Sequence, residues 1–149
     1  MTVKPLALVL LAGLLLSGCE RIDPNSPLGQ RKALFKQMLH ESEDLGGMLR
    51  GRLAFDGGKF ASGAAELDRL SRQPWQHFPQ AGKDGKSSAR DEVWQRQERF
   101  QQLVRELEAS AAALVAATSR PPLQPAELSA PMQRVEDACE ACHQEFRAF

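Results

Sequence analysis

The sequence predicts an all-α protein that folds as an antiparallel four-helix bundle. Ala, Leu, Gln, Glu and Arg dominate its 149 residues, Tyr is absent and β-branched residues are scarce, a composition that favours helix. Apolar residues recur at steps of three and four in four separate segments, which is the spacing of one helix face. Four amphipathic helices bury these faces most economically against one another. A coiled-coil dimer of longer helices is disfavoured, because Gly and Pro interrupt the pattern too often.

Residues 1–19 have the layout of an export signal. Lys4 precedes an apolar run, Leu6–Leu16, that is too short to span a bilayer comfortably. The run ends in Leu-Ser-Gly-Cys, which resembles the lipobox of bacterial lipoproteins. The resemblance implies that residues 1–18 are a cleaved signal peptide and that Cys19 carries lipid, anchoring the exported protein on the periplasmic side of a bacterial membrane. The next residue is glutamate rather than the aspartate of inner-membrane retention, so the outer membrane is slightly favoured. An ordinary secretory signal is the alternative.

Two further segments lack helical patterning. Residues 19–27 are polar and hold two prolines, as expected of a tether between the lipid and a domain over 28–149. Residues 72–90 are rich in Pro, Gly and Ser, and loops of this length are usually functional or disordered. Trp75 and Phe78 within this loop predict that its first half packs onto the domain.

Four helices are expected in the domain. The apolar pattern places them over about 28–54, 59–71, 91–119 and from 126 to the end, with the second ending before a proline. The third has a regular seam with steps of four and three, formed by Val93, Gln97, Phe100, Val104, Leu107, Ala111, Leu114 and Thr118.

The strongest chemical signal is Cys139-Glu140-Ala141-Cys142-His143, the C-x-x-C-H pattern of covalent c-type haem attachment. Each cysteine forms a thioether with one vinyl group of the porphyrin, and the histidine supplies a nitrogen ligand to the iron. Positions i, i+3 and i+4 of a helix share a face, so Cys139, Cys142 and His143 can all point at one haem. We therefore expect one haem c in the fourth helix.

Three other uses of this motif are weaker. A thioredoxin-like dithiol needs a βαβ context, which the sequence lacks. Zinc needs four ligands, and the motif supplies at most three, with His40 and His77 elsewhere in the chain. A disulfide would close a very short loop and gain little stability. Haem also accounts for the cysteine count, because Cys19 is assigned to lipid.

Four stretches together resemble the cytochrome c′ family. They span about Pro27 to Arg147, nearly the whole domain, and read QRKALFKQM (30–38), PWQHF (74–78), EVWQRQERF (92–100) and CEACHQEFR (139–147). C-x-x-C-H alone is moderately specific, and its C-terminal placement beside the other three makes the match strong. A lipid-bearing N-terminus departs from the family's usual soluble form.

The resemblance implies an open sixth iron position hidden behind an apolar side chain of the first helix, here Phe35. A phenyl ring neither ligates iron nor donates a hydrogen bond, so it disfavours O₂ and water while NO and CO still bind ferrous haem. The family's matching arginines place Arg31 near a haem propionate and Arg147 beside the proximal haem pocket. The residues alone are also consistent with plainer roles. Phe35 can be a core aromatic and Arg31 a charge on the helix surface. Arg147 can be a cation that interacts with a helix C-terminus.

These features favour a membrane-tethered, high-spin haem protein that binds NO and CO and protects the periplasm by sequestering NO. The alternatives are a low-spin electron carrier with Met38 as sixth ligand, and a sensory lipoprotein that reports to a partner. We expect no enzymatic turnover, because no polar distal base is apparent. Lys plus Arg equals Asp plus Glu at 19 each, which argues against a nucleic-acid partner. The resemblance also implies a possible redox partner and a possible homodimer through the first two helices.

Overall fold

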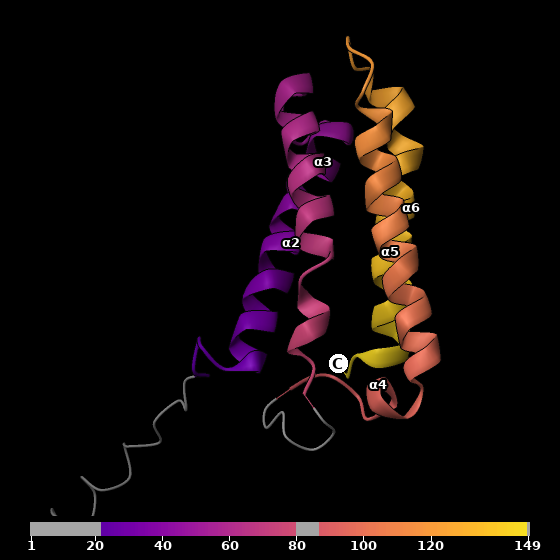
Figure 1. The fold of residues 1–149 in the computed structure, drawn as a ribbon. Coiled ribbons are helices and arrows are strands. Elements are labelled where there is room, and N and C mark those ends of the chain that lie inside the picture. Colours follow the sequence, from indigo (N-terminus) through magenta and orange to yellow (C-terminus); the bar gives the residue numbers. More distant parts are fainter. Residues whose placement is uncertain (1–21, 80–86, 149) are drawn as a thin grey trace, which may run out of the picture.

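The computed structural model describes residues 22–79 and 87–148, and these form an all-α bundle (Figure 1). Four long helices run along it, and a short 3₁₀ helix and a single helical turn lie in the connection between the second and third of them. In chain order the elements are α2 (Pro27–Leu49), α3 (Gly57–Ser71), η2 (Pro74–His77), α4 (Glu92–Gln95), α5 (Gln97–Ala117) and α6 (Pro125–Phe146).

The first long helix, α2, begins at a well-formed cap. The Ser26 hydroxyl accepts a hydrogen bond from the Gly29 amide at 3.0 Å, and Pro27 occupies the first turn, where its missing N–H costs nothing. The helix ends at Leu49 rather than near residue 54, so the predicted end was five residues too late. Gly51 has a φ of 74°, which turns the chain out of the helix and accounts for the earlier end.

The predicted third helix over 91–119 is divided at Arg96. This residue has φ −118° and ψ 49°, so α4 ends at Gln95 and α5 starts afresh at Gln97. Gln97, a polar member of the predicted seam, is exposed and its side-chain amide donates to the Val93 carbonyl across the break. The apolar members of the seam are buried as expected, among them Phe100, Leu107 and Leu114.

The core is divided into two clusters along the bundle axis. The larger lies among α2, α3, α5 and α6 and contains Leu45, Phe60, Ala64, Leu67, Leu70, Leu107, Leu114, Leu128, Met132 and Val135. The smaller lies where α4, α5 and the last turn of α6 meet, and contains Val93, Phe100, Leu103, Val104 and Phe146. α5 and α6 pack on each other along their length, and α2 packs on α3 and α6.

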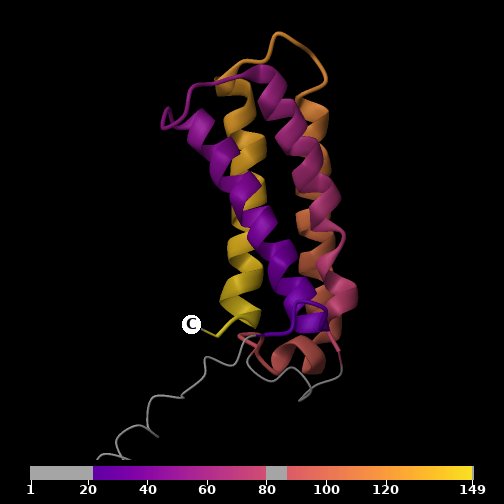
Figure 2. The same ribbon diagram turned by 90° about the vertical axis from the view of Figure 1, so that its left-hand side faces the viewer.

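The chain enters α2 and leaves α6 at the same end of the bundle, which also carries η2 and α4 (Figures 1 and 2). We call this the site end. The C-terminal segment is fastened here by antiparallel pairing, in which the Ala148 amide donates to Ser88 and the Arg90 amide to Phe146. Farther along the bundle, Arg50 at the end of α2 and Glu136 in the middle of α6 form an ion pair of 3.0 Å. Across the described residues, no helix combines the length and apolarity that a bilayer span requires.

Candidate haem site

The C-x-x-C-H motif lies in the last two turns of α6, at the site end. Cys139 and Cys142 are free thiols and both are partly buried, whereas His143 is exposed. The helix is unbroken from Pro125 to Phe146, so the motif keeps the i, i+3, i+4 arrangement that brings its three side chains to one side of the helix. The structure therefore confirms the helical setting predicted for the motif.

The two cysteines lie at the junction of the two core clusters. Cys139 packs against the larger cluster, against which Phe35 also packs, and Cys142 packs against the smaller one. Trp75 packs against both clusters. The thiols are thus placed where a large apolar ring would meet apolar side chains on both sides.

Aromatic rings extend from α2 to α6 across this junction. Phe35 meets Trp75 edge to face with centroids 5.8 Å apart, Trp75 meets Phe100 at 5.9 Å, and Phe100 meets Phe146 at 5.3 Å. Phe78 lies 5.2 Å from Phe100 and 6.5 Å from Phe35. Edge-to-face contacts at these separations are favourable, so the rings form one packed group at the site end.

Burial keeps both thiols protonated. It raises the pKa of Cys139 to about 11, and the negative charge of Glu136 acts in the same direction. It also raises the pKa of Cys142 to about 11, with smaller contributions from the charges of Cys139 and Glu145, opposed by Arg99. The free chain therefore carries two inert thiols rather than a reactive thiolate, which is unlike a redox-active dithiol.

Electrostatics favours a neutral imidazole at His143. The protein that partly surrounds the ring lowers its pKa, although much of its surface is exposed, and the positive charge of Arg147 lowers it further. A neutral imidazole is the form that binds a metal. Arg147 lies one turn after His143, and its amide donates to the His143 carbonyl at 3.1 Å.

Arg31 is buried, with 3% of its surface exposed. Its guanidinium donates to the His77 carbonyl at 2.6 Å and to the Ser87 hydroxyl at 2.9 Å, and it lies over the Phe78 ring at 4.1 Å. The interpretation of Arg31 as an exposed surface charge, which the sequence left open, is therefore wrong. Through His77 and Ser87, Arg31 links the first turns of α2 to both ends of the connection between α3 and α4.

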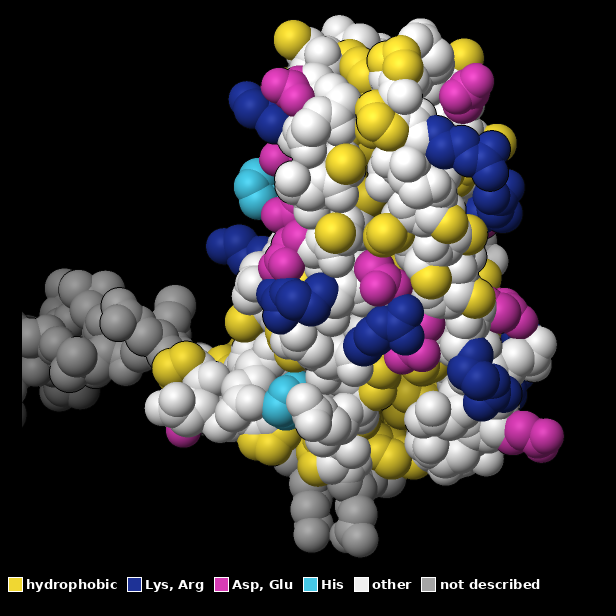
Figure 3. Space-filling view, turned by 45° about the horizontal axis from the view of Figure 1, so that its top comes forward, with side chains coloured by type: hydrophobic (Ala, Val, Ile, Leu, Met, Phe, Trp, Pro, Cys, Tyr) yellow, Lys and Arg dark blue, Asp and Glu magenta, His cyan; other side chains and the backbone are white. Residues whose placement is uncertain are grey.

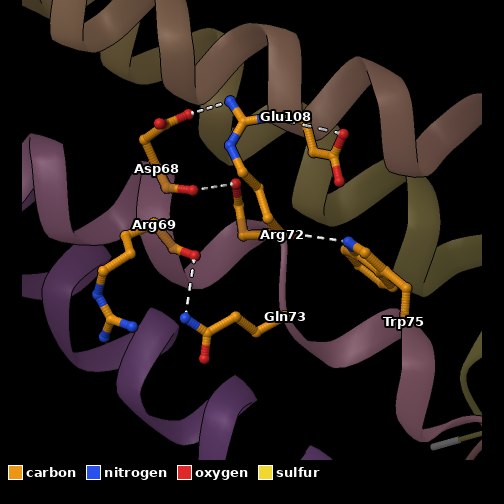
Figure 4. A network of polar contacts seen from close by, with 7 residues as sticks. Asp68, Arg69, Arg72, Gln73, Trp75 and Glu108 are labelled. Carbon is orange, nitrogen blue, oxygen red and sulfur yellow. Dashed lines mark hydrogen bonds and ion pairs between the residues drawn. The ribbon is translucent and has the colours of Figure 1, made fainter.

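Trp75, which the sequence predicts to pack onto the domain, contacts both core clusters. Its indole N–H donates to the Ser71 carbonyl at 2.6 Å, which fixes the ring at the end of α3 (Figure 4). The same turn is held by Arg72, which pairs with Asp68 at 2.7 Å and with Glu108 of α5 at 3.9 Å. In the sequence, the feature that could have indicated this role is a tryptophan between two prolines in a predicted loop.

Two residues were considered as other iron ligands. Met38 is buried in the larger core cluster, against which Cys139 and Phe35 also pack, with 6% of its surface exposed. His40 is exposed and pairs with Asp44 at 3.8 Å. Cys19, the predicted lipid attachment residue, lies outside the described residues together with the predicted signal peptide.

A family model described as cytochrome C′ matches residues 26–147, which covers the bundle and the C-x-x-C-H motif together. The chain belongs to the cytochrome c′ family. A cytochrome c′ from Rhodopseudomonas palustris is 28% identical over 145 residues, covering 96% of this chain and 97% of the relative.

Solved structures of cytochromes c′ share the fold. That of Shewanella frigidimarina matches with a TM-score of 0.78 at 23% identity, over 87% of this chain and 100% of the other. A variant of the Alcaligenes xylosoxidans cytochrome c′ in its nitric oxide complex matches with a TM-score of 0.75 at 22% identity, over 87% and 99% of the two chains. Another variant of that protein is bound to carbon monoxide.

Membership of the cytochrome c′ family implies a covalently bound c-type haem, and the residues present fit one. Two protonated thiols three residues apart lie at the junction of two apolar clusters, which suits thioether bonds to an apolar macrocycle. The next residue in the chain is His143, whose imidazole is favoured in its neutral form.

On the surface, Lys and Arg are interspersed with Asp and Glu, so neither sign of charge dominates the face in Figure 3.

Proposed function

We propose that this cytochrome c′ carries one haem, bound through Cys139 and Cys142 with His143 as iron ligand, and that it binds NO and CO at the open sixth position. The observation that carries the proposal is the placement of two protonated thiols between apolar clusters, with Phe35 in the aromatic group across the junction. The NO and CO complexes of the Alcaligenes xylosoxidans relatives support the ligand class. The proposed role is sequestration of NO rather than enzymatic turnover.

When bound, haem iron supplies the electron-rich centre that diatomic gases ligate. The chain's own contribution is to select among them. Phe35, Trp75 and Phe78 present ring carbons to one another, and the Trp75 N–H is already bonded to Ser71. These three aromatic side chains offer no hydrogen bond to a ligand bound at the iron. They therefore disfavour O₂, which needs polar stabilisation, but allow NO and CO to bind.

Arg31 and Arg147 are proposed to border the haem from two sides. Arg31 reaches the site end from α2, where its guanidinium can also meet a propionate. Arg147 lies one turn after His143, and its positive charge adds to the burial that lowers the pKa of the imidazole and favours its neutral, iron-binding form. Both arginines already interact with other groups of the chain, so a propionate would add to these contacts.

We further propose that the protein is exported and anchored by lipid at Cys19 on the periplasmic side of a bacterial membrane. The support is the Leu-Ser-Gly-Cys sequence after an apolar run. Its haem would then meet gases that cross the envelope. A redox partner and a homodimer remain as expectations from the family.

The test is a gas titration of the purified ferrous holo-protein followed by absorption. We expect one NO and one CO per haem and no stable O₂ complex. Phe35→Ala removes the phenyl ring that crowds the sixth position. We expect this to stabilise bound CO by about 1.4 kcal/mol, which is a tenfold rise in CO affinity. Phe35→Leu is the matched control, because it keeps an apolar side chain there. A stable O₂ complex, or CO affinity unchanged in Phe35→Ala, would contradict the proposal.

A further inference from the structure

The segment before α2 is folded against the helix that it enters. The Ser26 amide donates to the Asp23 carbonyl at 3.1 Å, and the Gln30 side chain donates to the Asn25 carbonyl at 2.9 Å. A Cβ on Gly29 would lie 2.2 Å from the Asp23 carbonyl oxygen, so this glycine permits the close approach. The Ile22–Ser26 segment is therefore folded against the start of α2.

The predicted lipid attachment residue is very close to this turn in sequence. Three Cα–Cα steps separate Cys19 from Ile22. At 3.8 Å per step, they span at most about 11 Å. A lipid on Cys19 would therefore hold Ile22, the residue before the Asp23 turn, within about 11 Å of the lipid-bearing residue.

The site end and the opposite end lie at very different distances from that attachment point. α2 has 23 residues. At 1.5 Å per residue it is about 35 Å long. Cys139, Cys142 and His143 lie at the site end, where the chain enters α2, whereas the α5–α6 connection lies at the opposite end (Figures 1 and 2). We propose that the anchored protein stands with its site end, and so its haem, facing the lipid surface; this rests on the lipid anchor of the proposed function.

Charge does not decide this orientation by itself. Arg96 and Arg99 share the single carboxylate of Glu145, at 2.8 and 2.6 Å, which leaves one positive charge in this group. That charge would draw the site end towards anionic lipid, whereas the exposed Lys32 and Lys36 along α2 would lay the bundle on its side. Salt screens both attractions, but it does not change the length of the tether. The short tether therefore predicts that the site end stays close to the lipid at high salt as well.

Two matched variants test the orientation. Gln95→Cys places a thiol at the site end and Gln124→Cys at the opposite end, and both native glutamines are exposed. In the full-length holo-protein the chain's three cysteines are assigned to lipid and haem, so the new thiol takes a nitroxide selectively. The labelled protein is placed in vesicles with and without a Ni²⁺-chelating lipid, and the difference in nitroxide relaxation reports proximity to the headgroups. The same domain without lipid, mixed with the same vesicles, is the control.

We expect a several-fold rise in relaxation rate at position 95 and no change at position 124, at low and at high salt. Equal rises at both positions, or a larger rise at position 124, would overturn the orientation. A mass spectrum of the protein settles the premise separately, because absence of lipid on Cys19 removes both the anchor and the orientation. The relaxation data do not depend on gas binding, so failure to bind NO would overturn the proposed function and leave this inference standing.

Discussion

Cys139 and Cys142 show how burial sets the chemistry of single residues. Both thiols have a pKa of about 11, against an ordinary value of 9.0, chiefly because burial disfavours the charged thiolate. Alkylation requires the thiolate. The haem-free protein should therefore react with iodoacetamide half-maximally near pH 11, measured by mass spectrometry against a peptide carrying the same five-residue motif. Half-maximal reaction near pH 9 in the folded protein would contradict the burial.

The same shift predicts the pH dependence of stability before haem is attached. The folded chain binds the thiol protons more tightly than the unfolded chain, because the folded-state pKa is the higher one. This contribution is fully present below about pH 9 and is lost as pH rises towards about 11. Thioether bonds remove both protons, so the holo-protein should lack this alkaline loss of stability.

At the scale of elements, Arg31 joins α2 to both sides of the α3–α4 connection. Arg31→Ala leaves the His77 carbonyl without its charged donor and removes the cation over Phe78, so we expect a loss of about 2–4 kcal/mol in the free energy of unfolding. Arg31→Lys should recover only part, because an ammonium cannot reproduce the guanidinium fork.

Urea denaturation followed by circular dichroism measures this loss. Lys32→Ala is the matched control, since Lys32 is the exposed basic neighbour on the same helix and should change stability by less than about 0.5 kcal/mol. Equal effects of Arg31→Ala and Lys32→Ala would show that the buried contacts of Arg31 contribute nothing.

The helices were predictable where a local signal marks them, and their ends less so. The end of α3 at Ser71 followed from the apolar spacing and Pro74, and its start at Gly57 lies two residues before the predicted one. The break at Arg96, in contrast, has no local breaker residue. The heptad pattern continues across Arg96, so periodicity alone predicted one helix there. The end of α2 was visible in principle at Gly51, but the pattern of apolar residues extended past it.

The residues of the candidate site also differ in how far the sequence could predict them. Cys139, Cys142 and His143 form a contiguous motif, so sequence spacing alone assigned them to one helix face. Arg31 and Trp75 depend on partners that lie elsewhere in the fold: the partners of Arg31 are 46 and 56 residues away. Neither burial nor a long-range partner has a signature in the residues beside them, which is why Arg31 stayed ambiguous until the bundle was assembled.

At the scale of the whole molecule, the fold brings the residues proposed to border the haem to one end. The start of α2 supplies Arg31 and Phe35, η2 and its neighbours supply Trp75 and Phe78, and the end of α6 supplies the motif. The opposite end carries the α5–α6 connection, and the Arg50–Glu136 pair joins the end of α2 to the middle of α6. This polarity would let the proposed lipid tether orient the haem as well as anchor the protein.

We propose a haem whose iron is held by His143 and whose sixth position stays open behind Phe35. Resonance Raman spectroscopy of the ferrous holo-protein is the sharpest test, because its marker bands report spin state and coordination number. We expect a five-coordinate, high-spin iron that binds added CO. A six-coordinate, low-spin iron without added ligand would contradict it and would point to an electron carrier in which a side chain, such as that of Met38, fills the sixth position.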